Sequence, residues 1–307
     1  MEVKQIHKLL SGKALTFGVF IILAFLARVS AGITIYEYIS WIVFIVQLCT
    51  AFLLVWINNK YQIVKKRTFL PAALFMLFTA SNPVLYDNIK GTVSALIMTI
   101  CLAFAFKSYH KPNSQINSFN IALILTVGSA FCLRPLLFFI PLFWIGFRWF
   151  KSLNSRTFFA SLLGVFTVYL FLFAWCIYRN DWDFFYDKIP HFREMISINW
   201  IKLQWYNWVV VAYIILLLLL PAVNIFVSGL SEKIRTTLFI EFLYLLAVTL
   251  FIFICLFDSM VDNVQPVIYL SIAFISGFYF AINESKLAIY LLIFTILFFI
   301  AIYICRY

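Results

Sequence analysis

The amino-acid sequence predicts an all-helical integral membrane protein with about 11 transmembrane helices. The 307 residues are 65% hydrophobic and only 11% charged, whereas a soluble domain is roughly half apolar and a quarter charged. The apolar residues form long continuous runs, and the basic residues concentrate in the short connections between them. No polar block is long enough for a separate soluble domain, so we expect residues 1–307 to form a single polytopic domain.

The predicted spans follow the apolar runs in chain order. They lie near 14–33, 39–58, 68–83, 90–106, 118–133, 135–149, 157–177, 208–227, 236–257, 265–282 and 287–305. The first run follows a basic segment and continues to full spanning length, so we expect a retained signal anchor. Residues 178–207 mix aromatic and charged side chains, which predicts an amphipathic loop at the membrane surface.

The orientation follows from the basic residues, because cytoplasmic loops of membrane proteins are enriched in lysine and arginine. Most of the 23 lysine and arginine residues fall in alternate connections. These residues are Lys4, Lys8, Lys13, Lys60, Lys65, Lys66, Arg67, Lys107, Lys111, Arg148, Lys151, Arg156, Lys233, Arg235 and Lys286. The N-terminus is therefore expected in the cytoplasm. Most of the 12 acidic residues fall on the outer side, either as part of a working surface or because outer loops tolerate them.

The stretch 118–149 predicts a short helical hairpin with Arg134 at its tip. As one straight helix it would be about 48 Å long, which is too long for a hydrocarbon core of about 30 Å. Both flanks are basic, so both ends are expected on the cytoplasmic side. Pro135 is the helix breaker near the middle. Each arm is only about 24 Å long, so Arg134 is expected below the outer membrane surface, facing protein or a wet cavity.

Arg28 is a second arginine near the outer end of a span. Two arginines at similar depth are suited to grip a phosphate through paired hydrogen bonds. The sequence therefore suggests a lipid-phosphate site formed by Arg28 and Arg134, with a polyprenyl phosphate as the membrane-borne ligand. The alternative is that each arginine reaches the interface alone or pairs with a carboxylate such as Glu37 or Asp87.

Glu37 is the single carboxylate of the first outer loop and lies between Tyr36 and Tyr38. A carboxylate beside the membrane and flanked by aromatic rings is a candidate general base for a sugar acceptor. An ordinary loop acid within the interfacial aromatic belt explains the same pattern.

The outer segment 178–207 holds the densest set of charged and aromatic residues. Its candidate substrate-binding residues are Arg179, Asp181, Asp183, His191 and Arg193. In extended chain the two aspartates would face the same side, although such a pair alone is an incomplete metal site. An interfacial helix without chemistry is the alternative. Asp258 and Asp262 form a secondary ligand pair with helical spacing.

Several function classes are excluded or disfavoured. The sequence has no phosphate-binding P-loop, no GxSxG, no HExxH and no glycine-rich dinucleotide motif, and we predict no metal site and no certain cofactor. The six cysteines lie in apolar runs and do not have the spacing of metal ligands, so we expect them to be buried thiols. The net charge of +11 comes from loop residues, so nucleic acid is not expected as a partner.

The stretch from Ile121 to Phe185 resembles the middle of the GT-C glycosyltransferases. It contains "IALILTVGSAFCLRPLLFFIPLFWIGFRWF" and "FFASLLGVFTVYLFLFAWCIYRNDWDFF". In the family, a helix with a glycine is followed by a basic residue and proline, an apolar helix, a basic turn, another span and an aromatic outer loop. The residues Gly128, Arg134, Pro135, Pro141 and Arg148 stand at those points.

The resemblance implies a GT-C-like core and transfer of a sugar or glycan from a polyprenyl-phosphate carrier on the periplasmic side. The family's catalytic carboxylate lies in the first outer loop, where Glu37 is the matching residue, although the family often has an acid pair in a longer loop. A related version, as in glycan ligases, would use His191 with Arg179 and Arg193. The alternative function is a non-enzymatic membrane subunit or scaffold of a cell-envelope assembly.

The whole chain, especially "RTFLPAALFMLFTASNPVLYDN", is also similar to a family of bacterial inner-membrane proteins. This similarity implies a multi-pass protein of the bacterial inner membrane. The expected partners are the lipid bilayer, a lipid-linked glycan and other membrane proteins.

Overall fold

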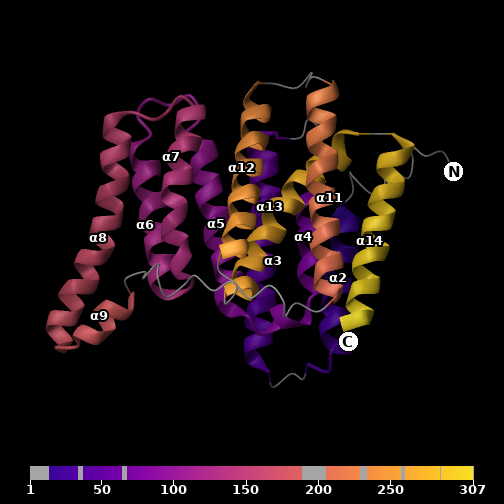
Figure 1. The fold of residues 1–307 in the computed structure, drawn as a ribbon, viewed down its shortest axis with the longest axis horizontal. Helices are drawn as coiled ribbons and strands as arrows, with labels where there is room; N and C mark the ends of the chain where they lie inside the picture. The colour runs from indigo at the N-terminus through magenta and orange to yellow at the C-terminus, as the bar shows by residue number, and fades with distance from the viewer. Residues whose placement is uncertain are drawn as a thin grey trace.

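The computed structural model describes residues 14–33, 37–63, 68–188, 205–228, 234–256, 260–283 and 285–306. Every regular element in these ranges is helical (Figure 1). The elements are α2 (Ala14–Ser30), α3 (Tyr38–Tyr61), α4 (Leu70–Ala80), η1 (Pro83–Tyr86), α5 (Ile89–Lys107), α6 (Gln115–Phe131), η2 (Arg134–Phe139), α7 (Ile140–Trp149), α8 (Ser155–Arg179), α9 (Trp182–Lys188), α11 (Trp205–Ser228), α12 (Ile234–Leu256), α13 (Val261–Ile282) and α14 (Lys286–Arg306).

Six helices of the described ranges are long and apolar enough to cross a membrane, namely α3, α5, α8, α12, α13 and α14. Shorter apolar helices occur at Thr16–Ser30, Leu70–Ala80, Gln115–Phe131 and Asn207–Val223. Helices of both groups expose apolar side chains on the surface of the bundle, as along α8, and such a surface suits contact with lipid rather than water. The helices therefore indicate a multi-pass membrane protein, while the count of about 11 spans stays a prediction.

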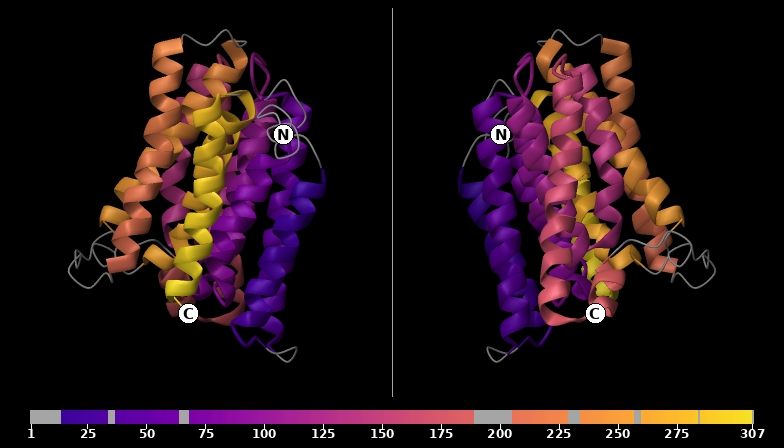
Figure 2. Two further views of the ribbon diagram at one scale, coloured as in Figure 1. Left: turned by 90° about the vertical axis from the view of Figure 1, so that its right-hand side faces the viewer. Right: turned by 90° about the vertical axis from the view of Figure 1, so that its left-hand side faces the viewer.

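The core of the bundle is built around α4 and α13. Every residue of α4 is buried, as is nearly all of α13 from Val264 onward. The two helices approach closely where Gly277 meets Pro71: a Cβ added at Gly277 would lie 2.7 Å from the backbone nitrogen of Pro71. Close approach through small residues is typical of helices packed within membranes. Helices α6 and α8 lie to one side of this pair and α14 to the other (Figure 1), and Figure 2 shows the bundle from its two sides.

The helices α6, α7 and α8 form a layer at one side of the bundle (Figure 1). Gly164 of α8 lies against the backbone of α6, where an added Cβ would come within 2.6 Å of the carbonyl oxygen of Phe119. Ser118 donates a hydrogen bond of 2.8 Å to the carbonyl oxygen of Thr157. Trp144 of α7 donates one of 2.9 Å to the hydroxyl of Ser161. Small and hydroxyl side chains thus connect all three helices of this layer.

The hairpin predicted at 118–149 is present, since α6 and α7 lie side by side and reverse direction between them (Figure 1). The reversal occurs at Leu133, whose backbone is extended, one residue before the predicted position. Arg134 is instead the first residue of η2. Pro135 sits in the first turn of that helix, where the fixed proline φ fits and no backbone N–H is required.

Charged residues are distributed unequally between the two ends of the helical bundle. The helices α5, α7, α11 and α13 end where α6, α8, α12 and α14 begin (Figures 1 and 2). Described basic residues at this end include Lys107, Arg148, Arg156, Arg235 and Lys286. The described acids of the outer segments, Glu37, Asp87, Asp181, Asp183 and Asp262, adjoin helix termini at the opposite end together with several cations. We refer to this second end as the outer end. Its assignment to the periplasm rests on the positive-inside rule.

Candidate functional site

Arg28 lies near the outer end of α2 and is completely buried. One guanidinium nitrogen donates a hydrogen bond of 2.6 Å to Oε1 of Gln47 on α3. The guanidinium carbon lies 4.7 Å from the ring centre of Phe44 and 4.4 Å from that of Tyr86, which is cation–π geometry. The side chain is therefore enclosed by protein and does not face a ligand-sized space in this arrangement.

Two buried polar atoms at this position, Nε of Arg28 and Nε2 of Gln47, have no hydrogen-bond partner in the described structure. Buried polar atoms normally find partners, so this spot is polar but sealed. The Tyr86 ring lies against the guanidinium, and the Tyr86 hydroxyl donates a hydrogen bond of 2.5 Å to the carbonyl oxygen of Ala80. Burial raises the pKa of the Tyr86 hydroxyl, which therefore stays protonated as a donor.

Arg134 is half-buried at the tip of the hairpin, and its carbonyl oxygen accepts a hydrogen bond of 2.7 Å from Ser129. The hairpin and α2 lie on different sides of the bundle (Figure 1). The structure therefore does not bring Arg28 and Arg134 together, which corrects the expectation of a shared phosphate grip. The positions of the two residues within their apolar runs indicate a similar depth but carry no information on where they lie in the plane of the membrane.

Glu37 is exposed and directly precedes α3, without a side-chain hydrogen bond to the helix end. Of the predicted substrate residues, Asp181 accepts a hydrogen bond of 3.1 Å from the backbone N–H of Phe184 and so caps α9. Asp183 is exposed, and Arg179 lies over the ring of Trp175 at 5.0 Å. His191 and Arg193 lie outside the described residues.

A cavity of about 410 Å³ lies at the outer end between α11, α12, α13 and the last residue of α14. Most of its wall is apolar and comes from α11, α12 and α13, including Val210, Ile214, Phe251 and Ile268. One part of the wall is polar. It consists of Asn82, Asn207, Asp262, Gln265, Tyr269 and Arg306. We call this space the Arg306 cavity. Its size is in the usual range for a small-molecule site.

Arg306 is held at the polar part by residues from three other segments. Its guanidinium donates a hydrogen bond of 2.8 Å to Oδ1 of Asn207 at the start of α11. It donates a second one, of 3.5 Å, to the carbonyl oxygen of Ser81 after α4. It also interacts with the hydroxyl of Tyr269 on α13. These contacts fix the position of the guanidinium at the cavity wall, and sequence reasoning did not single out this residue.

A chain of amide and hydroxyl groups extends from the same position. The side-chain amide of Asn82 donates a hydrogen bond of 2.9 Å to Oε1 of Gln265. The amide of Gln265 in turn donates one of 2.5 Å to the hydroxyl of Tyr269. Asn88 donates 2.9 Å to the backbone carbonyl of Asp262, whose own side chain is exposed. Asp262 is thus the carboxylate at the cavity wall, whereas Glu37 is not among the lining residues.

The arrangement is suited to an amphipathic molecule. A cation and several uncharged hydrogen-bonding groups lie at one part of the wall, and hydrocarbon covers the rest. The first turns of α11 and α13 also face the cavity through Asn207 and Asp262, and helix N-termini favour anions. Within the described residues, no group of three or more His, Cys, Asp or Glu side chains could hold a metal ion.

Comparison of the chain with protein-family models, with curated proteins and with solved structures gives no match.

Proposed function

We propose that this membrane protein binds a lipid with an anionic head at its outer end, and that the lipid is a polyprenyl-phosphate-linked sugar or glycan. The observation that carries the proposal is the Arg306 cavity, in which a positioned guanidinium adjoins a mostly apolar wall. Arginine donates paired, charge-assisted hydrogen bonds to phosphate oxygens. The apolar wall from α11, α12 and α13 would cover the first part of the hydrocarbon chain.

The sugar or glycan would lie toward the amide groups beside Arg306. Asn82, Asn207 and Gln265 offer donors and acceptors that suit a polyhydroxylated group. If the protein transfers the sugar, a carboxylate must take the proton of the acceptor hydroxyl. Asp262 is exposed at the cavity wall and is therefore better placed for this role than Glu37.

The second candidate function is a non-enzymatic subunit of an envelope assembly that binds the same lipid without reacting it. The position of Glu37 outside the cavity favours this alternative, because the carboxylate that the GT-C resemblance selects does not face the candidate lipid site. Under both functions the protein lies in the bacterial inner membrane with the Arg306 cavity on the periplasmic side.

Binding of a polyprenyl phosphate to the purified protein tests the proposal, with the uncharged polyprenyl methyl ether as reference ligand. Arg306→Gln should weaken phosphate binding by about 10- to 100-fold, because a hydrogen bond to a charged group contributes about 1.5–3 kcal/mol. Arg306→Lys keeps the charge and should retain part of the affinity. Arg156→Gln is the matched control, since Arg156 is an exposed arginine at the opposite end of the protein and should leave binding unchanged.

Equal phosphate affinity in the folded Arg306→Gln variant and in the unaltered protein would refute the proposed site. Mass spectrometry of polyprenyl-linked glycans in cells then separates the two functions. Loss of transfer in Asp262→Asn, with lipid binding retained, indicates an enzyme that uses this carboxylate. The same loss in Glu37→Gln alone would return the catalytic role to Glu37, and an unchanged lipid profile in both variants favours the non-enzymatic subunit.

A further inference from the structure

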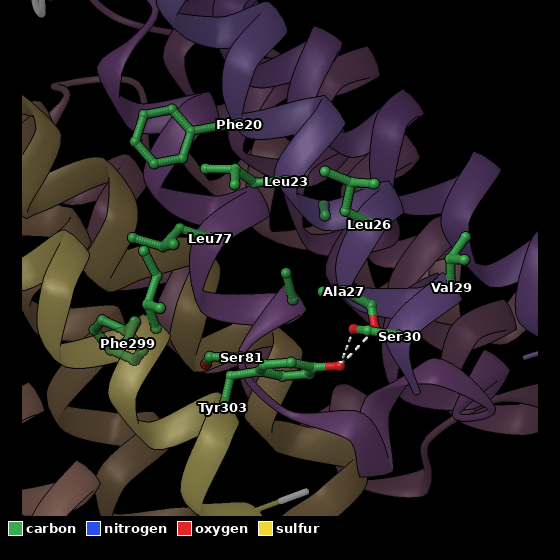
Figure 3. A pocket seen from close by; sticks show the side chains of 13 residues that line it. Phe20, Leu23, Leu26, Ala27, Val29, Ser30, Leu77, Ser81, Phe299 and Tyr303 are labelled. Carbon is green, nitrogen blue, oxygen red and sulfur yellow. Dashed lines mark hydrogen bonds between the residues drawn. The ribbon is translucent and has the colours of Figure 1, made fainter. Parts of the chain in front are cut away.

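A second cavity of about 410 Å³ lies between α2, α4 and α14 (Figure 3). Nearly all of its wall is hydrocarbon, with Phe20, Leu23, Leu77 and Phe299 among the lining residues (Figure 3). Leu26 also lines it and is 53% exposed, so the cavity opens at the side of the bundle, on the surface that would contact lipid. We call it the Tyr303 cavity.

Three hydroxyl residues line this hydrocarbon space. The hydroxyl of Ser81 donates a hydrogen bond of 2.8 Å to the carbonyl oxygen of Phe78, and those of Ser30 and Tyr303 contact each other. The hydroxyls of Ser30 and Tyr303 lie 2.6 Å apart, and Tyr303 donates 2.7 Å to the carbonyl oxygen of Ala27 (Figure 3). Ser30 lies 3.0 Å from the same carbonyl oxygen. Ser30 is the last residue of α2, and Tyr303 lies in the last turn of α14. The hydroxyls are therefore at the outer end, at the level expected for lipid heads of that leaflet.

The hydrogen bonds define which kind of head group fits. Each hydroxyl has one proton, and the bonds among Ser30, Tyr303 and the carbonyl of Ala27 use both. The Ser30 oxygen has two lone pairs and retains the capacity to accept a hydrogen bond. A head group that binds here must therefore donate a proton. No lining residue is charged, and a charged head placed against hydrocarbon without a counter-charge is strongly unfavourable.

We propose that the Tyr303 cavity binds a lipid alcohol, a neutral lipid with a long hydrocarbon chain and a free hydroxyl head. The hydroxyl donates to Ser30 beside Tyr303, and the chain lies against the apolar residues of α2, α4 and α14. This inference is independent of the function proposed for the Arg306 cavity, because it rests on a different set of side chains and on a ligand without charge.

Photolabelling of the purified full chain tests the inference. The probes are a long-chain primary alcohol with a diazirine in its chain and the methyl ether of the same molecule, which cannot donate a hydrogen bond. Labelled peptides are mapped by mass spectrometry. The alcohol should label peptides of α2 and α14 about fivefold more than the ether does, which is the effect of one uncharged hydrogen bond.

Substitutions test whether the labelling depends on the Tyr303 cavity. Ser30→Ala should reduce alcohol labelling to the level of the ether, and Leu26→Trp, which fills the cavity, should reduce labelling by both probes. Tyr290→Phe is the control, since Tyr290 is an exposed tyrosine of α14 that does not line the cavity, and labelling should not change. Melting temperatures confirm that each variant folds. Equal labelling by alcohol and ether would indicate ordinary bilayer contact and overturn the proposal, as would labelling confined to helices other than α2, α4 and α14.

Discussion

Replacing Gln47 by leucine tests whether the protein itself holds the buried guanidinium of Arg28. The hydrogen bond from Arg28 to Gln47 is 2.6 Å long, and the next polar contact, to the carbonyl oxygen of Ala24, is 3.5 Å. A hydrogen bond to a charged group contributes about 1.5–3 kcal/mol, so Gln47→Leu should lower the free energy of unfolding by that amount. Asn59→Leu, at an exposed amide of the same helix, should change it by less than about 0.5 kcal/mol.

The double variant Arg28→Leu/Gln47→Leu makes the test quantitative. It removes the buried charge together with its partner, and replacing both members of a buried polar pair by apolar residues is often neutral. The double variant should therefore be at least as stable as Gln47→Leu, with a coupling between the sites of about 1–3 kcal/mol. Unfolding in mixed micelles, followed by circular dichroism, measures these differences.

The same variants test the function that the sequence suggested for Arg28. If Arg28 only stabilises the packing of α2 against α3, the double variant should bind a polyprenyl phosphate as well as the unaltered protein does. Strictly additive effects on stability, or a tenfold loss of phosphate binding in a folded double variant, would refute this interpretation of Arg28.

Two further predictions concern packing and helix capping. Gly277→Ala places a Cβ 2.7 Å from the backbone of Pro71, where ordinary contacts are 3.4–4 Å, so it should cost about 1–3 kcal/mol. Gly18→Ala meets nothing within 4 Å and should instead stabilise α2 by up to about 1 kcal/mol; equal melting temperatures would contradict the close approach. Asn154→Ala removes the Asn154 side-chain half of the capping box with Thr157 and should cost about 1 kcal/mol, seen as faster amide exchange in the first turn of α8. Unchanged exchange would show that this cap is unimportant.

The positions of the helices were largely predictable because composition alone determines them in a chain of this kind. A run of apolar residues long enough to cross a bilayer must satisfy its backbone internally, and a helix does so. The run at 236–257 corresponds to α12 (Ile234–Leu256), and that at 265–282 lies within α13 (Val261–Ile282). The break near Pro135 was predictable because proline is disfavoured in a helix interior and the apolar run around it is too long for a single span. Proline alone does not decide this, since Pro221 and Pro266 lie inside α11 and α13.

The candidate site was not predictable in the same way. A charge within an apolar run indicates depth, and this is how the sequence singled out Arg28. Depth does not tell whether a side chain faces a cavity or is enclosed, and the enclosure depends on Gln47 and Tyr86, which come from other segments. Arg306 ends an apolar helix and looks like a cation that compensates the helix dipole. Only the packing brings it to Asn207 and Ser81.

Ser81 contacts residues of both cavities. Its carbonyl oxygen accepts a hydrogen bond from Arg306, and its side chain lines the Tyr303 cavity. Arg306 and Tyr303 lie within one turn of each other on α14, so they move together if the helix shifts as a rigid body. A shift of α14 that takes Arg306 away from Ser81 must therefore also change the distance from Tyr303 to Ala27. If ligands of the two cavities favour different positions of α14, linkage requires each to change the affinity of the other by the same factor.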